Sequence, residues 1–445
     1  MRPCSPEGGS LDVTSSSPFS VEAVEGTPEL EAALKRLRER GATDLARVEP
    51  AVRQVLDAVR DGGDQAVLAL VQQFEGRQPD PLFVSDYGGA EALASLPAAV
   101  ADALRAAADR IARFHQRQAE ELRSFVYDED GVRLGARVTP LERVGVYAPG
   151  GKARYPSSVL MSAVVARVAG VRQIFVATPN ASAEVRAACH LAGVRAILDA
   201  GGAQAIAALA YGTESVPKVD KIVGPGNIYV AAAKRLVFGE VAIDSIAGPS
   251  EILVIADETA DAAIVAADLL SQAEHDEAAY ALLLTTEASL VAAVRRELTA
   301  QLADLPRRPV ATAALRDNGM ALVVSTRERL AEVANLLAAE HVALHVRDPR
   351  ALADQIERAG ALFIGPNTPE AAGDYLAGPS HVLPTGGAAR FAAPLGVYDF
   401  VSRSSVIEYT AEALSAHGPA IEALAEAEGL GGHARAVSIR TRRTS

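Results

Sequence analysis

The chain has 445 residues, 49% of them hydrophobic and 22% charged, a composition that fits folded globular units and excludes wholesale disorder. This length predicts about two to four structural units. The net charge of −13 and the lack of a long basic stretch argue against nucleic acid as a partner. No run reaches about 18 strongly apolar residues, so no membrane span is expected. The two cysteines, Cys4 and Cys189, suit a reducing compartment, and we expect a cytoplasmic protein.

The first 20 residues are rich in Ser, Pro and Gly and lack the apolar core of a signal peptide, which predicts a flexible extension. From Thr27 to about Leu122 the pattern is helical. One helix begins at Thr27-Pro28 and ends at Gly41, and another covers residues 97–122. Around Phe125 the apolar period changes toward two, and Asp128-Glu129-Asp130-Gly131 predicts a hairpin turn.

After Val144 short aliphatic strands alternate with helices. Continuous aliphatic strands separated by helices are typical of parallel sheets that are covered on both faces. Strands are predicted near 144–147, 174–178, 196–200, 220–224, 252–257, 280–286, 321–326, 342–346 and 361–365. Helices are predicted near 158–169, 181–192, 204–211, 228–237, 261–273, 290–305, 327–339 and 349–359.

The predicted fold class is α/β, with two incomplete Rossmann-like, parallel-sheet domains in tandem and small units at both ends. We expect residues 1–26 to form the flexible extension and residues 144–250 the second α/β domain. The first α/β domain is expected to be discontinuous, from 27–143 and 251–392. Residues 393–445 are expected to form a small C-terminal dimerisation unit.

Ligands of open α/β sheets bind at the carboxyl ends of strands, so two glycine-rich loops are candidate sites. These are Ala148–Gly151 and Gly224–Asn227, the second of which opens a helix. The GPGNIY stretch matches only half of a dinucleotide fingerprint, because Tyr229 stands where the third Gly belongs. A standard Rossmann pyrophosphate loop is therefore not supported, and a plain strand-to-helix turn is the alternative.

Histidines beside acidic residues supply the candidates for chemistry. Gln272 and His275 share one face of a helix end and offer ligands for Zn²⁺, but their spacing alone is poor evidence for a metal and favours a C-terminal histidine stabilised by the helix dipole. Glu340-His341 stands at a helix-to-strand junction, where both side chains can face a cleft as an acid/base pair. A capping Glu and an interface His form the alternative, and His345 on the same strand face is expected to be structural.

Two further polar stretches follow. Gly373-Asp374-Tyr375 and Ser380-His381 form an irregular patch that is a reasonable site candidate. Glu428 and His433 lie in a glycine-rich motif within the last twenty residues, where an ordered histidine needs a reason.

At these stretches the chain resembles histidinol dehydrogenase, and the resemblance spans nearly all of residues 27–439. The segments that carry it occur in order and with the correct separations: VGVYAPGG, VDKIVGPGNIYVAAAKR, IAGPSEILVIAD, DLLSQAEHD, Glu340-His341, AGDYLAGPSHVLPTGGAARF and AEGLGGHARAV. One departure is Ser380, where many members of the family have Asn.

The resemblance implies a homodimer with one Zn²⁺ per subunit, which uses NAD⁺ to oxidise L-histidinol to L-histidine through a bound aldehyde. It implies zinc ligands at Gln272, His275 and Asp374, with His433 supplied by the partner chain, and an acid/base pair at Glu340 and His341. The same zinc ligands and His341 would contact the substrate, together with Ser250, His381, Tyr375 and Glu428. Tyr147, Gln204 and Asn227 would contact NAD⁺.

Two other functions remain open at this stage. A related enzyme could oxidise another small polyol, but it would be expected to lose groups that recognise imidazole and amine, such as His381 and Glu428. A metabolite-binding protein without activity would be expected to lose Glu340, His341 or a zinc ligand. All of these residues are present.

Overall fold

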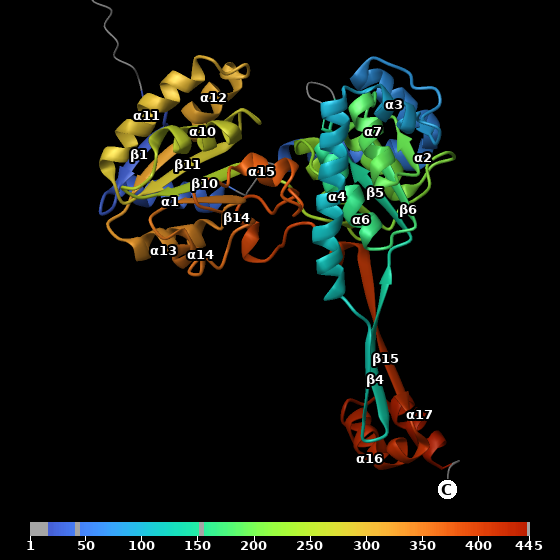
Figure 1. Cartoon of the computed structure of the whole chain (residues 1–445). Coiled ribbons are helices and arrows are strands. Elements are labelled where there is room, and N and C mark those ends of the chain that lie inside the picture. The colour runs from blue at the N-terminus through green and yellow to red at the C-terminus, as the bar shows by residue number, and fades with distance from the viewer. Residues whose placement is uncertain (1–16, 41–44, 151–154, 443–445) are drawn as a thin grey trace, which may run out of the picture.

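The computed structural model describes residues 17–40, 45–150 and 155–442. The start of the expected N-terminal extension with Cys4, Gly151 of the first glycine-rich loop and the last three residues lie outside them. Figure 1 shows two α/β domains side by side and a long arm that carries a pair of helices at its far end. Among the described residues, no helix has the length and apolar character needed to cross a membrane.

The first domain is built on a six-stranded parallel sheet in the order β1-β12-β11-β10-β13-β14. Alternate residues of its central strand face opposite cores: Ile252 and Val254 lie in one, Leu253 and Ile255 in the other. Its strands are β1 Val21–Val24, β10 Glu251–Ala256, β11 Tyr280–Thr285, β12 Met320–Val323, β13 His341–His345 and β14 Ala361–Ile364. Its helices are α1 Pro28–Glu39, α10 Ala262–Ala273, α11 Ala288–Leu302, α12 Arg308–Asn318, α13 Arg327–Leu337, α14 Pro349–Ala353 and α15 Glu370–Tyr375.

The second domain repeats this plan with a sheet in the order β2-β7-β6-β5-β8-β9, which is parallel except for the β2–β7 pair. Its strands are β2 Phe83–Val84, β5 Arg143–Tyr147, β6 Gln173–Ala177, β7 Ala196–Leu198, β8 Lys221–Val223 and β9 Ala242–Ile243. Its helices are α2 Leu45–Glu75, α3 Gly89–Ser95, α4 Ala98–Glu120, α5 Pro156–Val159, the π-helical η1 Leu160–Val164, α6 Val165–Val168, α7 Ala183–Ala192, α8 Gly202–Tyr211 and α9 Ile228–Val237.

The arm is a three-stranded antiparallel sheet in the order β15-β4-β3, followed by two helices that pack together. Its elements are β3 Phe125–Glu129, β4 Val132–Pro140, β15 Val401–Tyr409, α16 Ala411–Ala427 and α17 Gly431–Thr441. The turn of the predicted hairpin is confirmed between β3 and β4. Two short 3₁₀ helices, η2 Ala388–Arg390 and η3 Val397–Phe400, precede β15.

The predicted domain boundaries were wrong in two places. Of the helices in residues 27–143, only α1 belongs to the first domain, because α2, α3 and α4 bury their apolar faces in the cores of the second domain, against helices that include α7, α8 and α9. An apolar face shows that a helix is partly buried but does not show which domain it packs on. Val21–Val24, assigned to the flexible extension, instead forms the edge strand β1, which pairs with β12. The tandem α/β class itself is confirmed.

Candidate active site

The predicted site residues of the first domain come together at the amino-terminal edge of its sheet. Gln272 lies in the last turn of α10, and His275 follows two residues after the end of this helix at Ala273. Ser250 directly precedes β10, and His341 opens β13. Helix α15, which lies on the side of this domain that faces the second (Figure 1), carries Asp374. Five separate segments therefore supply the site, and the His381 loop is the fifth.

Three side chains form a group with the spacing of metal ligands. The ligand atoms of His275, Glu370 and Asp374 all lie within 4.8 Å of one another. Glu370 and Asp374 are four residues apart on α15, so they project from one face of that helix. Burial raises the pKa of Asp374 to about 6 and holds the pKa of Glu370 well above its usual range. A cation bound beside these carboxylates would stabilise their ionised forms.

The fully buried side chain of Gln272 lies against this group. With its amide oriented to satisfy both neighbours, its nitrogen donates to Glu370 Oε1 at 2.5 Å and its oxygen accepts from the Glu251 backbone N–H at 2.6 Å. In this orientation the amide nitrogen, which cannot ligate a metal, faces Glu370. The opposite orientation turns the amide oxygen toward Glu370, and in that orientation the oxygen could ligate a cation. His381 borders the same group, since its Nδ1 lies 3.7 Å from Asp374 Oδ1.

Glu340 and His341 are both buried beside the group, at 6% and 5% exposure. Burial, reinforced by the charge of Glu251, holds the pKa of Glu340 well above its usual range. Burial also lowers the pKa of His341 to about 4, so its imidazole is neutral near pH 7. His341 Nδ1 lies 3.0 Å from the Glu251 carbonyl, which only accepts, so this nitrogen carries the hydrogen. His341 Nε2 is then free to take a proton and lies 3.8 Å from Glu370 Oε1.

The residues predicted to contact the cofactor lie at the carboxyl-terminal edge of the second sheet. Tyr147 ends β5, and its buried hydroxyl accepts from the Gly202 N–H at 3.1 Å. Gln204 lies in the first turn of α8 and donates to Glu75 Oε1 at 3.2 Å. Asn227 caps α9, because its Oδ1 accepts from the Tyr229 and Val230 N–H groups.

The loop after β8 passes very close to the end of β5. Gly224 has a φ of +111°, and a Cβ at this position would lie 2.1 Å from the Tyr147 carbonyl oxygen. Only glycine permits this approach, so the first Gly of GPGN has a structural reason. The Tyr147 and Asn227 segments are consequently held side by side.

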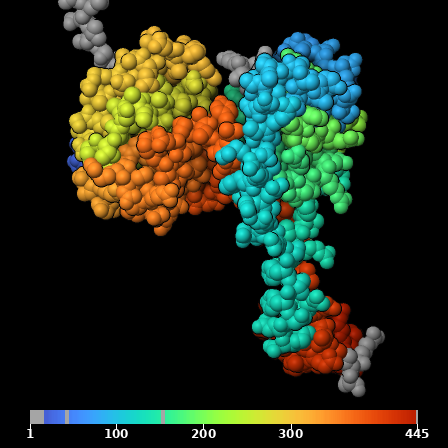
Figure 2. Space-filling model, in the orientation of Figure 1, coloured from blue at the N-terminus to red at the C-terminus, as the bar shows by residue number. Residues whose placement is uncertain are grey.

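Glu428 and His433 are not brought to the site within one chain. Both are exposed and lie at the far end of the arm, at the end of α16 and the start of α17, away from both domains (Figures 1 and 2). Within the described part of a single chain, the residues with metal-ligand spacing are therefore His275, Glu370 and Asp374, which we call the metal-type group.

Sequence reasoning missed Glu370, Glu251 and Arg40. Glu370 stands one helical turn before Asp374, a spacing that could have revealed it. Glu251 opens a strand of five apolar residues, which is an unusual place for a charge. Arg40, which forms a buried ion pair with Glu251, has no local signal because its partner is 211 residues away.

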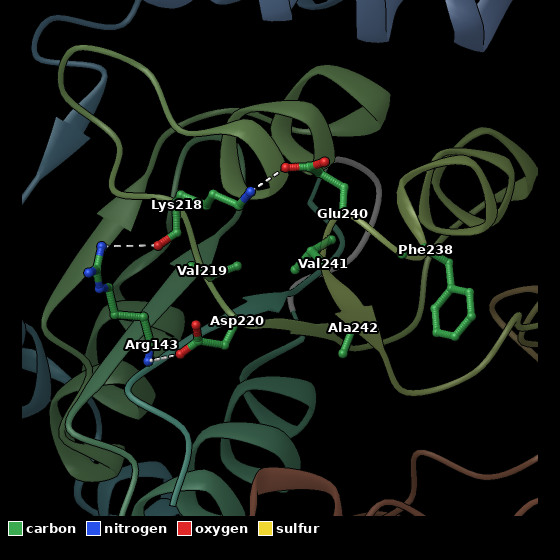
Figure 3. A pocket seen from close by; sticks show the side chains of 9 residues that line it. Arg143, Lys218, Val219, Asp220, Phe238, Glu240, Val241 and Ala242 are labelled. Atoms are coloured by element: carbon green, nitrogen blue, oxygen red, sulfur yellow. Dashed lines mark hydrogen bonds and ion pairs between the residues drawn. The ribbon is translucent and has the colours of Figure 1, made fainter. Parts of the chain in front are cut away.

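A hollow of about 500 Å³ lies at the opposite edge of the second sheet, around Arg143, Lys218 and Glu240 (Figure 3). Its charged groups already contact one another: Lys218 Nζ pairs with Glu240, and the Arg143 guanidinium donates to the Lys218 carbonyl at 3.2 Å. None of the predicted site residues lines this hollow.

The fold and the site define a two-domain α/β enzyme in which the buried side chains of Glu340 and His341 adjoin donors suited to a cation. The histidinol dehydrogenase family model matches residues 38–441, and the chain belongs to this family. It is therefore an oxidoreductase with histidinol dehydrogenase function in histidine biosynthesis, and the resemblance stated from its motifs is confirmed.

Relatives and a solved structure agree along nearly the whole chain. Histidinol dehydrogenases from Syntrophotalea carbinolica and Aquifex aeolicus are 52% and 48% identical, each over 92% of this chain and 96% of the relative. The crystal structure of histidinol dehydrogenase from Elizabethkingia anophelis superposes with a TM-score of 0.89 at 34% identity, over 96% of this chain and 99% of that one.

Proposed function

We propose that this chain forms a homodimer with one Zn²⁺ per subunit and uses NAD⁺ to oxidise L-histidinol twice. The first oxidation gives L-histidinaldehyde, which stays bound, and the second gives L-histidine. The observation that carries the proposal is the group of His275, Glu370 and Asp374, with ligand atoms within 4.8 Å of one another, beside the buried pair of Glu340 and His341.

The donors fit zinc by their chemistry. Imidazole nitrogen and carboxylate or amide oxygen are suitable Zn²⁺ ligands, so Gln272, His275 and Asp374 would hold the ion together with His433 of the partner subunit. When bound, Zn²⁺ would orient the imidazole and amine of the substrate and polarise its reacting oxygen. Gln272 would ligate the ion through its amide oxygen, in the orientation that turns this oxygen toward Glu370, and Glu370 would remain beside the ion.

His341 would take the hydroxyl proton during the first oxidation. Its depressed pKa keeps it neutral, and its Nε2 points toward the metal-type group. Glu340 would accept a proton from the water that adds to the aldehyde. For that step it must be ionised, and a cation bound nearby lowers the pKa of a buried carboxyl.

The remaining substrate contacts would come from Ser250, His381 and Tyr375, with Glu428 of the partner subunit. Burial lowers the pKa of His381 to about 4, so it would offer a neutral imidazole for hydrogen bonding. NAD⁺ would supply the hydride acceptor, and Tyr147, Gln204 and Asn227 would position it along the carboxyl edge of the second sheet, where dinucleotides bind in such folds.

Support for the dimer comes from the arm. It projects from the domains (Figure 2) and exposes a dense set of apolar side chains: Phe125, Val126, Tyr127, Ile407, Tyr409, Leu424, Leu430 and Ile439. Exposed apolar clusters of this kind mark interfaces. Seating the arm on a second subunit would cover them and bring His433 and Glu428 to that subunit's site. The buried free thiol of Cys189 accords with a reducing, cytoplasmic location.

The experiment is a spectrophotometric assay of purified protein with Zn²⁺, NAD⁺ and histidinol, combined with metal analysis. We expect two NADH per histidinol and one zinc per chain. If the enzyme oxidised another polyol but not histidinol, the proposed substrate would be wrong. If activity survived complete removal of metal, the proposed zinc site would be refuted.

A further inference from the structure

A buried ion pair lies directly behind the acid/base residues. The side chains of Arg40 and Glu251 are each 1% exposed and contact one another through Arg40 Nε and Glu251 Oε2. Arg40 follows α1, whereas Glu251 is the first residue of β10, so the pair joins a covering helix to the central strand of the sheet. Arg40 also donates to the Leu337 carbonyl at 2.8 Å, at the end of α13.

Glu251 and Glu340 hold each other through reciprocal hydrogen bonds. The Glu251 N–H donates to Glu340 Oε2 at 2.9 Å, and the Glu340 N–H donates to Glu251 Oε1 at 3.3 Å. The Glu251 carbonyl accepts from His341 Nδ1, and its Oε1 also accepts from the Gly386 N–H at 2.8 Å. One residue thus contacts the carboxylate of Glu340, the ring of His341 and the loop after Pro384.

The turn that leads into Glu340 and His341 contains a residue in an unfavourable backbone conformation. Ala338 adopts a left-handed conformation with a φ of 46°, between the end of α13 at Leu337 and the pair at 340–341. A left-handed alanine costs free energy and persists only where its surroundings hold it. The Arg40 contact to the Leu337 carbonyl lies immediately before this turn, and the Glu251 contacts lie immediately after it.

Stability alone is a weak reason for such a pair. Removing two charges from water is expensive, and well-packed apolar residues often replace a buried ion pair without loss of stability. A pair retained behind two reactive side chains is better explained by the orientation that it imposes on them.

We propose that Arg40 and Glu251 are positioning residues that orient Glu340 and His341 for both oxidation steps. Glu251 presents the His341 ring with its hydrogen on Nδ1, which leaves Nε2 facing the metal-type group. Arg40 keeps the Glu251 carboxylate in place and ties it to the end of α13. This inference rests on the proposed roles of Glu340 and His341.

The test compares Glu251→Gln and the milder Arg40→Lys with a matched control that removes another ion pair. The control is Lys221→Met with Asp399→Asn, a partly buried pair of the second domain with Nζ and Oδ1 2.9 Å apart, which contacts none of the site residues. The turnover number of each half-reaction, the KM for histidinol, the zinc content and the thermal midpoint are measured for each folded, metal-loaded variant. Starting from the aldehyde isolates the second half-reaction.

We expect Glu251→Gln to lower the turnover number of both half-reactions about 10- to 100-fold, with KM and zinc content near those of the unsubstituted enzyme. Arg40→Lys, which retains the charge, should lose about 3- to 10-fold, and it also provides the test if Glu251→Gln does not fold. The control should lose thermal stability without losing turnover. Variants of Arg40 and Glu251 that lose stability but keep normal turnover would overturn the proposal.

A second measurement separates this inference from the proposed function. The urea midpoints of Glu251→Gln, Glu340→Gln and the double variant should be non-additive, because the two residues contact one another. An unsubstituted enzyme that is inactive on histidinol would count against the proposed function. Non-additive urea midpoints would still support the proposal that Glu251 positions Glu340. Additive midpoints would overturn this positioning role even in an active enzyme.

Discussion

The two sheets share a plan but place their candidate site residues at opposite edges. In the second domain Tyr147 ends β5, and Gln204 and Asn227 follow β7 and β8. This carboxyl edge is the usual ligand edge of an open parallel sheet. In the first domain Ser250 and His341 lie at the amino ends of β10 and β13. Fold alone therefore does not locate a site, and two similar domains can contribute different edges to one enzyme.

The chemistry of the two edges differs as well. The second edge offers a hydroxyl, amides and backbone N–H groups, which suit an extended, polar ligand. The first edge concentrates buried ionisable groups, and the backbone N–H groups of Glu251 and Glu340 stabilise carboxylates there. Groups with strongly shifted pKa values gather at the first edge, as expected where protons are transferred.

The largest effect is expected at Glu340 and His341, the proposed acid/base pair at the first edge. His341→Asn should slow the alcohol step by about 100- to 10,000-fold and Glu340→Gln should slow the aldehyde step by a similar factor, because each removes one proton acceptor. Separate assays that start from histidinol and from the aldehyde measure the two steps. Equal damage to both steps by both variants would contradict the division of roles.

The next effect concerns the cation. Asp374→Asn should weaken zinc binding by about 100-fold or more, since it removes a charged donor from the group with His275 and Glu370. His345→Asn is the control, because His345 is a buried histidine in β13 of the same domain that pairs with Asp268 at 2.7 Å and lies outside the group. Metal analysis after dialysis distinguishes the two variants, and full zinc retention by Asp374→Asn would remove Asp374 from the ligand set.

The proposed sharing of the site across chains predicts complementation. His433→Ala and His341→Ala should each be inactive, whereas a mixture that has exchanged subunits should regain about one quarter of the normal activity. Half of the dimers are then mixed, and each mixed dimer holds one intact site. Activity is measured after exchange has been verified with differently tagged chains, and a mixture that stays inactive would place His433 outside the site.

The smallest effect is expected at the second edge. Tyr147→Phe removes the acceptor for the Gly202 N–H, and Gln204→Ala removes the amide that contacts Glu75. Each should raise the KM for NAD⁺ by roughly tenfold or less, the value of one hydrogen bond, with zinc content unchanged. Loss of zinc from either variant would show that the two edges are not independent.

Much of the fold follows from local pattern. The apolar period placed α1, α4, α9 and α10 within a few residues of their observed bounds, and β10 and β13 were recognised as continuous aliphatic strands. Helix α14 is shorter than predicted and ends at Ala353. The assignment of α2, α3 and α4 to the first domain was wrong, because an amphipathic pattern shows that one face of a helix is buried but not which domain it packs on.

The residues of the candidate site were likewise only partly predicted from the sequence. Gln272, His275, Glu340, His341, Asp374 and His381 were all singled out from the sequence, and the structure places them around one group of donors. Glu370 and the Arg40–Glu251 pair were not. Their importance lies in contacts between segments that are far apart along the chain, and no local pattern encodes such contacts.

The order of residues was enough to predict the tandem α/β fold and the family and to name most of the candidate site residues, because periodicity and short motifs are local properties. Folding decided which edge of each sheet carries which residues, which sheet each helix covers, and that the arm leaves His433 far from its own chain's donors. These outcomes depend on long-range packing, in which burial and charge pairing act between residues hundreds of positions apart.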